Sequence, residues 1–537
     1  MNNSNVFHSE ALPRHKQLSP RLMIALFCAA LFGAILFNGQ RSLWDTSETR
    51  YAEASREMVA SHNWLFPQIE GHPHLTKPPL TYWIIATSIK VLGKSEWSVR
   101  LGPALSFALA VLLTTLLANL LLHDPRRALF AGLLQMLSPL AFFGAHVLTT
   151  DTFVALFVLG YFWAMWNALL ASKNSEGRRW ALLMHFFLVL AFLTKGPPAW
   201  LPAGAAIVFL FLNREHYPWR RLCRPEGLAL LVVGSLAWYV AILLEVPNAA
   251  SVWREEALQK VFVASNRNMP AVTYLPILLG GVLPSIIVLF IAYKSKRSPS
   301  PSDKIPAAIS PPQRNFLTLW VALPLVAFCL SRTRLPLYVL PLAPAFAIAA
   351  AAAAPAAWFH FGRKNQPAWI TSRIALAGLA WLVFLIGVKA WLPLRGYTSK
   401  DLKPVAAAIR LDSEKLNASP HLMLTMPRMG SGLLYYLDGP PTDRLENHLQ
   451  NEDSMGRTRQ ISSAFSHPLP TNVREYIILK SKDIPDYDSI LVSHVERVFS
   501  NAEWTVWRRN SQQAICLLNS DFSPHSRRTS FQVARHD

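Results

Sequence analysis

Charged residues are scarce in this chain: Asp, Glu, Lys and Arg make up 16% of its 537 residues, against about 25% in ordinary soluble domains. The deficit lies in long apolar runs, and 52% of the residues are hydrophobic. This composition excludes a single soluble globular protein and indicates an integral membrane protein. Acidic residues are scarcer than basic ones, 32 against 52, so the chain has a net charge of +20.

Cysteine is also scarce. Cys28, Cys223, Cys329 and Cys516 lie far apart, without CxxC or metal-ligand spacing. Three of them lie in or beside apolar segments, and only Cys516 stands alone in the tail. The spacing therefore argues against a disulfide framework and against a zinc ribbon.

About eleven apolar runs are long enough to be predicted membrane spans. They cover roughly 21–38, 101–122, 128–145, 152–171, 180–194, 199–213, 228–244, 273–293, 316–331, 335–355 and 374–394. Basic residues gather in every second loop, beginning with Arg14, Lys16 and Arg21 before the first run. The positive-inside rule explains the net charge without a nucleic acid partner and predicts a cytoplasmic N-terminus. It places loops 39–100, 146–151, 195–198, 245–272 and 332–334 on the opposite face.

The composition becomes that of a soluble domain at about residue 396. Short apolar runs predict strands there: His421–Met426, Leu433–Leu437, Tyr476–Leu479 and Ser489–Val492. We therefore expect a polytopic α-helical membrane domain over residues 1–395 and a small α/β domain over residues 396–537, on the outer face.

The long outer loop 39–100 carries the first candidate site. Asp45 and Glu48 stand three residues apart just after the first span, and Arg50 follows them. Asp45 could act as a base toward an acceptor hydroxyl, with positive neighbours keeping it ionised. Two simpler interpretations stay open. Asp45 could be the N-cap of a helix over Arg50–Val59, or these residues could be ordinary solvated charges of an interfacial helix.

The other outer loops each place ionisable residues at a span end, and such residues are functional candidates at membrane depth. They are Lys77 before two prolines, Asp151, Lys195, Arg332 and Arg334. Snorkelling lysines and helix caps are the alternatives. A polyprenyl-phosphate sugar would use such a set well, because lysine and arginine can bind its phosphate and stabilise the charge that develops as phosphate leaves.

Several motifs together resemble a known family. They are Asp45-Thr-x-Glu-x-Arg-Tyr-Ala-Glu53, Arg56-Glu57-Met58, Asn63-Trp64-Leu65-Phe66-Pro67, Lys77-Pro78-Pro79, Glu96-Trp97-x-x-Arg100-Leu101, Lys195-Gly196-Pro197 and Leu335-Pro336-Leu337-Tyr338-x-Leu340-Pro341. In this order, over roughly residues 20–350, the chain resembles the bacterial aminoarabinose–lipid A transferases (ArnT-like). That family belongs to the GT-C superfamily, together with the protein O-mannosyltransferases.

The resemblance implies a GT-C fold and assigns roles to matching residues. Asp45, Glu48 and Asp151 would be catalytic, and Lys77, Lys195 and Arg50 would bind the carrier phosphate, joined by Arg332 and Arg334. The chain departs from the family pattern at Thr76, where Glu is frequent, and in loop 245–272, which has no histidine. We therefore predict no metal ligands; at most, Asp45 and Glu48 would hold a divalent cation loosely.

The expected function is transfer of a sugar from a polyprenyl (undecaprenyl) phosphate carrier to lipid A, lipopolysaccharide or another envelope acceptor. The reaction would occur on the periplasmic face of a bacterial inner membrane, and membrane lipids would surround the chain. A protein O-glycosyltransferase of the same fold is the alternative. A transporter of a lipid-linked sugar fits less well, because the polar residues gather at one face rather than near the bilayer midplane.

Overall fold

The computed structural model describes residues 18–262, 270–296, 309–331, 334–359, 368–395, 400–424, 430–440, 442–444, 470, 472–481 and 495–509. The chain forms two compact units. The first contains residues 1–41 and 54–395, and the second contains residues 42–53 and 396–537. A short segment of the first outer loop, with Asp45 in it, therefore belongs to the same unit as the C-terminal region, and the boundary at 53/54 falls within helix α2 (Glu48–Ala60).

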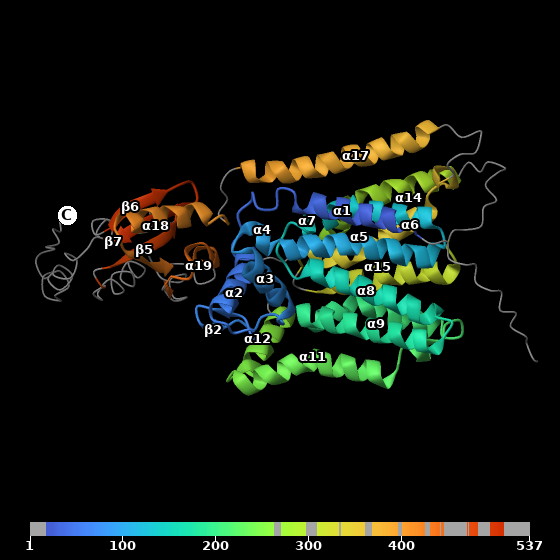
Figure 1. Cartoon of the computed structure of the whole chain (residues 1–537), viewed down its shortest axis with the longest axis horizontal. Helices are drawn as coiled ribbons and strands as arrows, with labels where there is room; N and C mark the ends of the chain where they lie inside the picture. The colour runs from blue at the N-terminus through green and yellow to red at the C-terminus, as the bar shows by residue number, and fades with distance from the viewer. Residues whose placement is uncertain are drawn as a thin grey trace, which may run out of the picture. The chain divides into compact units, whose positions relative to one another are not determined.

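The first unit is a bundle of helices, most of them parallel or antiparallel to one another (Figure 1). Its helices are α1 (Pro20–Ile35), α3 (Leu80–Leu92), α4 (Glu96–Val99), α5 (Leu101–Leu122), α6 (Pro125–Met136), α7 (Pro139–Gly144), α8 (Asp151–Leu170), α9 (Asn174–Lys195), α10 (Leu201–Leu212), α11 (Pro225–Glu245), α12 (Ala249–Phe262), α13 (Tyr274–Gly281), α14 (Leu283–Lys296), α15 (Pro311–Leu330), α16 (Ala343–Ala353) and α17 (Ala368–Trp391). Short 3-10 turns include η1 (Pro197–Trp200) and η4 (Pro336–Leu342).

In the described part of the chain, seven helical stretches are long and apolar enough to cross a membrane, and the bent pair α13–α14 would make an eighth. The polytopic helical class is therefore confirmed, and the chain is an integral membrane protein. The predicted runs 21–38 and 199–213 fall on shorter apolar helices, Pro20–Ile35 and Pro197–Leu212. The run 128–145 is divided between α6 and α7. The count of about eleven spans stays a prediction.

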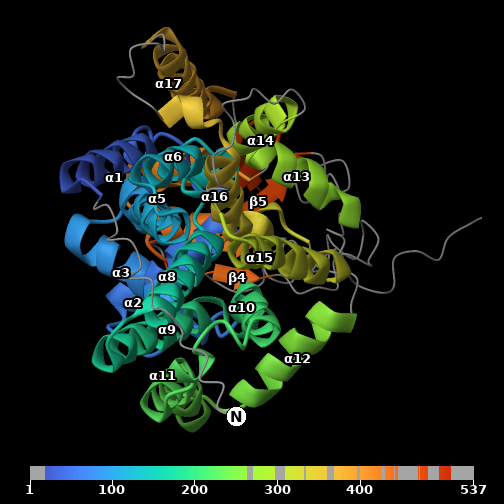
Figure 2. The same cartoon turned by 90° about the vertical axis from the view of Figure 1, so that its right-hand side faces the viewer.

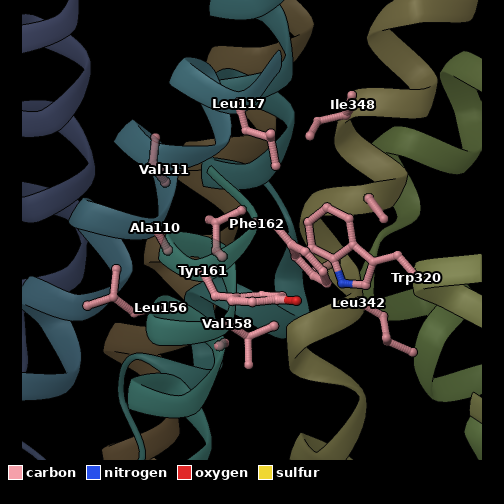
Figure 3. Close-up of a cluster of buried hydrophobic side chains, with 14 of the residues drawn as sticks. Ala110, Val111, Leu117, Leu156, Val158, Tyr161, Phe162, Trp320, Leu342 and Ile348 are labelled. Atoms are coloured by element: carbon pink, nitrogen blue, oxygen red, sulfur yellow. The ribbon is translucent and has the colours of Figure 1, made fainter. Parts of the chain in front are cut away.

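Helix α8 forms the centre of the bundle. Its apolar window is 83% buried, whereas that of α17 is 11% buried. Viewed along the bundle, α5, α8 and α16 lie near the middle, and α11 and α17 lie at opposite edges (Figure 2). Aromatic rings fill the core: Phe162 of α8 packs against Trp320 of α15 with ring centroids 4.4 Å apart, beside Tyr161 (Figure 3).

Two contacts explain how neighbouring helices pack closely. Gly132 of α6 faces α5, where a Cβ would meet the Thr115 hydroxyl oxygen at 2.1 Å, so only glycine allows this approach. Arg127, 8% exposed at the start of α6, donates to the carbonyls of Ala351, Ala352 and Ala354 at 2.8–3.0 Å. These carbonyls end α16 and lack partners within their own helix, so Arg127 caps that helix.

The loop 39–100 contains the expected helices α2, α3 and α4, and also a short hairpin that was not expected. Its strands β1 (Gln68–Ile69) and β2 (His72–Pro73) pair antiparallel. The turn between them has Glu70 and Gly71 at positive φ. Their N–H groups donate to the Glu57 carboxylate at 2.8 and 2.7 Å, which ties the turn to α2.

The second unit contains a five-stranded sheet of order β4-β3-β5-β7-β6. The strands are β3 (Ser419–Leu424), β4 (Thr442–Arg444), β5 (Val473–Lys480), β6 (Val495–Ser500) and β7 (Trp504–Arg509). Strand β3 is parallel to β4 and β5, and β7 is antiparallel to β5 and β6. Helix α18 (Lys403–Lys415) packs its apolar face on the sheet. The small α/β region expected near the C-terminus is confirmed.

One predicted strand is wrong. Leu433–Leu437 lies in helix α19 (Ser431–Leu437), which ends where Asp438 and Gly439 adopt positive φ. A short continuous apolar run fits a buried strand and a buried helical turn equally well, so periodicity could not separate them. The runs His421–Leu424 and Tyr476–Leu479 are strands as expected, whereas Met426 and Ser489–Val492 lie outside the described residues.

Candidate functional site

In the first unit, Asp151 and Lys195 form an ion pair. Asp151 is the first residue of α8 and Lys195 the last of α9, and these two helices form an antiparallel hairpin. Their Nζ and Oδ1 atoms are 2.5 Å apart, and the side chains are only 15% and 9% exposed for Lys195 and Asp151. The structure thus joins two candidates that the sequence analysis had given separate roles.

Aromatic residues surround this pair. The Lys195 ammonium lies 4.0 Å from the ring centroid of Tyr338, in η4, so the cation contacts both a carboxylate and an aromatic face. Tyr274, 1% exposed at the start of α13, lies within electrostatic range of both Asp151 and Arg334. Arg334 donates to the Cys329 carbonyl, with Nη2 at 2.9 Å.

Sequence reasoning gave no role to either tyrosine. Tyr338 stood within a quoted motif, four residues after Arg334. That position beside a span end was the signal that could have singled it out. Tyr274 opens an apolar helix without any such mark. Arg332, the other candidate arginine, lies outside the described residues.

Lys77 lies in a constrained turn of the same unit. Its Nζ donates to the Thr76 carbonyl at 2.9 Å, and the side chain is half-buried. Pro78 and Pro79 follow, both buried, and α3 begins at Leu80. Proline fixes φ, so the backbone after Lys77 has little freedom. The expected approach of Lys77 to Lys195 stays a prediction.

Asp45 belongs to the second unit and is 3% exposed. Its Oδ2 accepts the N–H of Gly430 at 2.9 Å, and its Oδ1 accepts the N–H of Gly432 at 3.3 Å and the hydroxyl of Thr49. The Asp45 N–H donates to the Lys400 carbonyl at 2.9 Å. Sequence reasoning missed Gly430 and Gly432 as partners, since nothing local connects them to the first loop.

Glu48 and Arg50 have different surroundings from one another. Glu48 is fully buried, and its Oε2 accepts the Trp44 N–H at 3.0 Å. Arg50 is exposed, and its Nε donates to the Thr46 carbonyl at 2.5 Å. Helix α2 begins at Glu48, and the hydrogen bonds of Asp45 go to Thr49 and the two glycines. The N-cap alternative therefore does not describe this geometry.

The positive charge of Arg50 favours the ionised form of Asp45, as expected, but burial acts in the opposite direction. Burial is the largest influence and raises the pKa of Asp45, because a desolvated carboxylate is less stable in its charged form. The hydrogen bonds from Thr49, Gly430 and Gly432 lower the pKa, and the charge of Arg50 lowers it further, but burial outweighs them. A carboxylate with a raised pKa binds a proton more readily.

No three His, Cys, Asp or Glu side chains within the described ranges come together in a group that could hold a metal ion. Both oxygens of Asp45 and Oε2 of Glu48 accept hydrogen bonds from protein donors. These contacts add no further ligand for the divalent cation that Asp45 and Glu48 were expected to hold loosely. That cation stays a prediction.

Known proteins resemble this chain in sequence. A family model described as dolichyl-phosphate-mannose-protein mannosyltransferase matches residues 76–243. The undecaprenyl phosphate-alpha-4-amino-4-deoxy-L-arabinose arabinosyl transferase 2 of Pseudomonas fluorescens is 31% identical over 60% of this chain and 56% of its own length. The corresponding transferase of Pseudomonas savastanoi pv. phaseolicola is 28% identical over 78% of this chain and 76% of its own length. The match thus spans little more than half of the first relative.

Solved structures share the fold. ArnT from Cupriavidus metallidurans, in a crystal structure with undecaprenyl phosphate bound to that protein, superposes with a TM-score of 0.72 at 20% identity. The match covers 92% of this chain and 99% of that one. The Archaeoglobus fulgidus oligosaccharyltransferase superposes with a TM-score of 0.53 at 11% identity, over 86% of this chain and 70% of that one. The resemblance inferred from the motifs is confirmed: this chain is ArnT-like in sequence and has the GT-C fold.

Proposed function

We propose that this protein is a membrane glycosyltransferase that transfers a sugar from undecaprenyl phosphate to lipid A or another envelope glycan. The observation that carries the proposal is the mostly buried side chain of Lys195, whose ammonium is held between the Asp151 carboxylate and the Tyr338 ring. Its relatives are named as transferases that use an undecaprenyl-phosphate-linked aminoarabinose.

This arrangement suits a phosphate leaving group. During transfer, the bond between the anomeric carbon and the carrier phosphate oxygen breaks, and a bond to the acceptor oxygen forms. Negative charge then grows on the departing phosphate. A fixed cation in a poorly solvated site stabilises that charge more than a solvated lysine would. We propose that Lys195 and Lys77 bind the carrier phosphate, with Arg50, Arg332 and Arg334 contributing positive charge around it.

The carboxylates would serve the sugar and the acceptor. We propose Asp45 and Glu48 as catalytic residues, together with Asp151. Burial raises the pKa of Asp45, which would make it a stronger proton acceptor from an attacking hydroxyl. If the acceptor is a lipid A phosphate, which is already anionic, no base is needed, and Asp45 would orient the sugar.

We place the reaction on the periplasmic face of a bacterial inner membrane. The candidate residues lie in outer loops of the predicted topology, opposite the loops rich in Lys and Arg. In the same topology, residues 1–395 form the membrane domain, and residues 396–537 form a periplasmic α/β domain.

A protein acceptor is the second candidate function. The description of the matching family model names a protein as the acceptor of the sugar. The model covers residues 76–243, which include Lys77, Asp151 and Lys195. These three residues would act on the carrier side of the reaction, so they fit either acceptor. The choice between the two functions therefore depends on the product.

The test is transfer by the purified full-length protein in lipid nanodiscs. Undecaprenyl phosphate-linked 4-amino-4-deoxy-arabinose is the donor, lipid A and envelope proteins are offered as acceptors, and mass spectrometry identifies the product. We expect the mass of lipid A to rise by one sugar. Lys195→Ala should lower the rate about 100-fold or more, as loss of a transition-state donor does.

Lys173→Ala is the matched control, because Lys173 is an exposed lysine at the opposite end of α9. It should transfer sugar at the wild-type rate. A sugar on envelope protein, with lipid A unchanged, would support the second candidate. Full activity of a folded Lys195→Ala variant would contradict the assigned role of the pair.

A further inference from the structure

Three tryptophans hold the loop that leads to Lys77 by its backbone. The indole N–H of Trp83 donates to the Trp64 carbonyl at 2.7 Å, and that of Trp238 donates to the Leu65 carbonyl at 2.7 Å. The indole N–H of Trp253 donates to the Leu75 carbonyl at 3.1 Å. The first two bonds fix the loop before the β1–β2 hairpin, and the third fixes it after the hairpin.

The Trp253 bond is set within an apolar cluster. Leu75 is 3% exposed and packs with Trp238 and Ile242 of α11. Trp253, on α12, packs its ring 6.1 Å from that of Trp238 and 4.9 Å from that of Tyr239. The ring of Trp253 is thus held by its neighbours, so its N–H has a defined direction.

Lys77 lies two residues after the carbonyl that Trp253 holds. Pro78 and Pro79 restrict the backbone on its other side. The backbone of Leu75–Pro79 is therefore held at both ends, and the Lys77 side chain, whose Nζ donates to the Thr76 carbonyl, extends from a fixed point. A rigid backbone of this kind lowers the entropy lost when a lysine binds an anion.

We propose that Trp253 is a positioning residue, which holds Lys77 in the direction that binds the phosphate of the lipid carrier. This rests on the proposed function, in which Lys77 binds that phosphate. Trp253 acts through the Leu75 carbonyl and does not touch the ligand. Helix α12 thereby contributes to carrier binding although it carries no candidate site residue.

Trp253→Phe tests the proposal, because phenylalanine keeps an aromatic ring but has no N–H to donate. Trp83→Phe is the matched control: it also removes an indole hydrogen bond to the backbone of this loop, but the carbonyl that Trp83 holds, that of Trp64, lies before the hairpin. The assay is binding of undecaprenyl phosphate to purified full-length protein, with thermal unfolding measured in parallel. Trp253→Phe should weaken binding about three- to tenfold, the loss expected for one hydrogen bond. Trp83→Phe should leave binding unchanged at a similar loss of thermal stability.

A second comparison separates positioning from general weakening of the fold. Trp253→Phe is repeated in a Lys77→Met background, where residual binding is measured at higher lipid concentration. If Trp253 acts through Lys77, the substitution has no further effect on binding there. An equal loss in both backgrounds, or an equal loss with Trp83→Phe, would overturn the proposal.

The outcome also distinguishes this inference from the proposed function. Unchanged binding by Lys77→Met would overturn both, because Lys77 would then not bind the carrier. Strongly weakened binding by Lys77→Met, with normal binding by Trp253→Phe, would overturn the role of Trp253 alone.

Discussion

Variants of the Asp151–Lys195 ion pair can show whether the pair serves the stability of the protein, sugar transfer, or both. Both side chains are mostly buried, and their charged atoms are 2.5 Å apart. Removing one partner leaves the other charge buried without compensation, which costs about 3–5 kcal/mol. Replacing both by neutral groups of similar size removes the charge altogether and is often close to neutral. Replacing Lys195 also removes its contact with the Tyr338 ring, which adds about 0.5–2 kcal/mol to the loss of stability.

We therefore expect Lys195→Met to lower the thermal midpoint of the purified protein markedly, and Asp151→Asn to lower it less, since asparagine still accepts a hydrogen bond. The double variant should be more stable than Lys195→Met alone. A coupling of about 2–3 kcal/mol between the two substitutions would match a buried, directly bonded pair. The assay is thermal unfolding in detergent, compared with sugar transfer by the same samples.

The double variant should remain inactive although its stability returns, because the cation that binds phosphate is missing. Additive losses of stability in the double variant would refute the reasoning, since they would mean that each charge is compensated by something other than its partner. Transfer by the double variant at the wild-type rate would show that the pair serves the fold alone.

Four further predictions concern other parts of the chain. Arg127→Leu should destabilise the protein by about 1.5–3 kcal/mol, the worth of one charge-assisted hydrogen bond, because a single Nη1 group serves all three carbonyls; thermal unfolding measures it, and a shift no larger than that of an exposed arginine would contradict the capping role. Gly132→Ala should lower the thermal midpoint through the clash with Thr115. Adding Thr115→Ser to that variant should not restore the midpoint, because the hydroxyl that clashes remains. Asp45→Asn should change the pH dependence of unfolding: burial raises the folded pKa, so the wild-type carboxylic acid adds stability below the unfolded value of 3.8 and loses that contribution as pH rises through the folded pKa. The midpoint difference, wild type minus variant, should therefore fall as pH rises, and a difference that grew with pH would oppose the assignment. Chelator treatment should leave transfer unchanged, since Asp45 and Glu48 oxygens already accept protein hydrogen bonds, and activity restored by one specific metal would overturn this.

Much of the membrane domain could be predicted from the sequence, because a membrane-spanning helix is a local property. Runs such as 101–122 and 152–171 carry their own signal in length and hydropathy. The pairing of Asp151 with Lys195 also had a local origin. Two consecutive helices of similar length, joined by a short loop, return the end of the second to the start of the first.

Other parts of the site depend on contacts between distant segments and had no local signal. The partners of Asp45 are backbone N–H groups of Gly430 and Gly432, and every residue except proline has such a group. The burial that raises the pKa of Asp45, against the effect of Arg50, arises from the same packing. The misassigned run Leu433–Leu437 failed for a related reason, since its five residues are too few to show a period.

The bond between Asp45 and Gly430 has a consequence for how the protein is made. Gly430 lies 385 residues after Asp45 in the chain. At a synthesis rate of about 5–20 residues per second, the first segment waits roughly 20–80 s before its partner leaves the ribosome. During that time the buried carboxylate of the finished protein has none of its later glycine donors, although the helices between them are entering the membrane. A nascent chain arrested before residue 430 would therefore hold the first loop in a state that the mature protein does not contain, and protease access to residues 42–53 would report when this last step of assembly occurs.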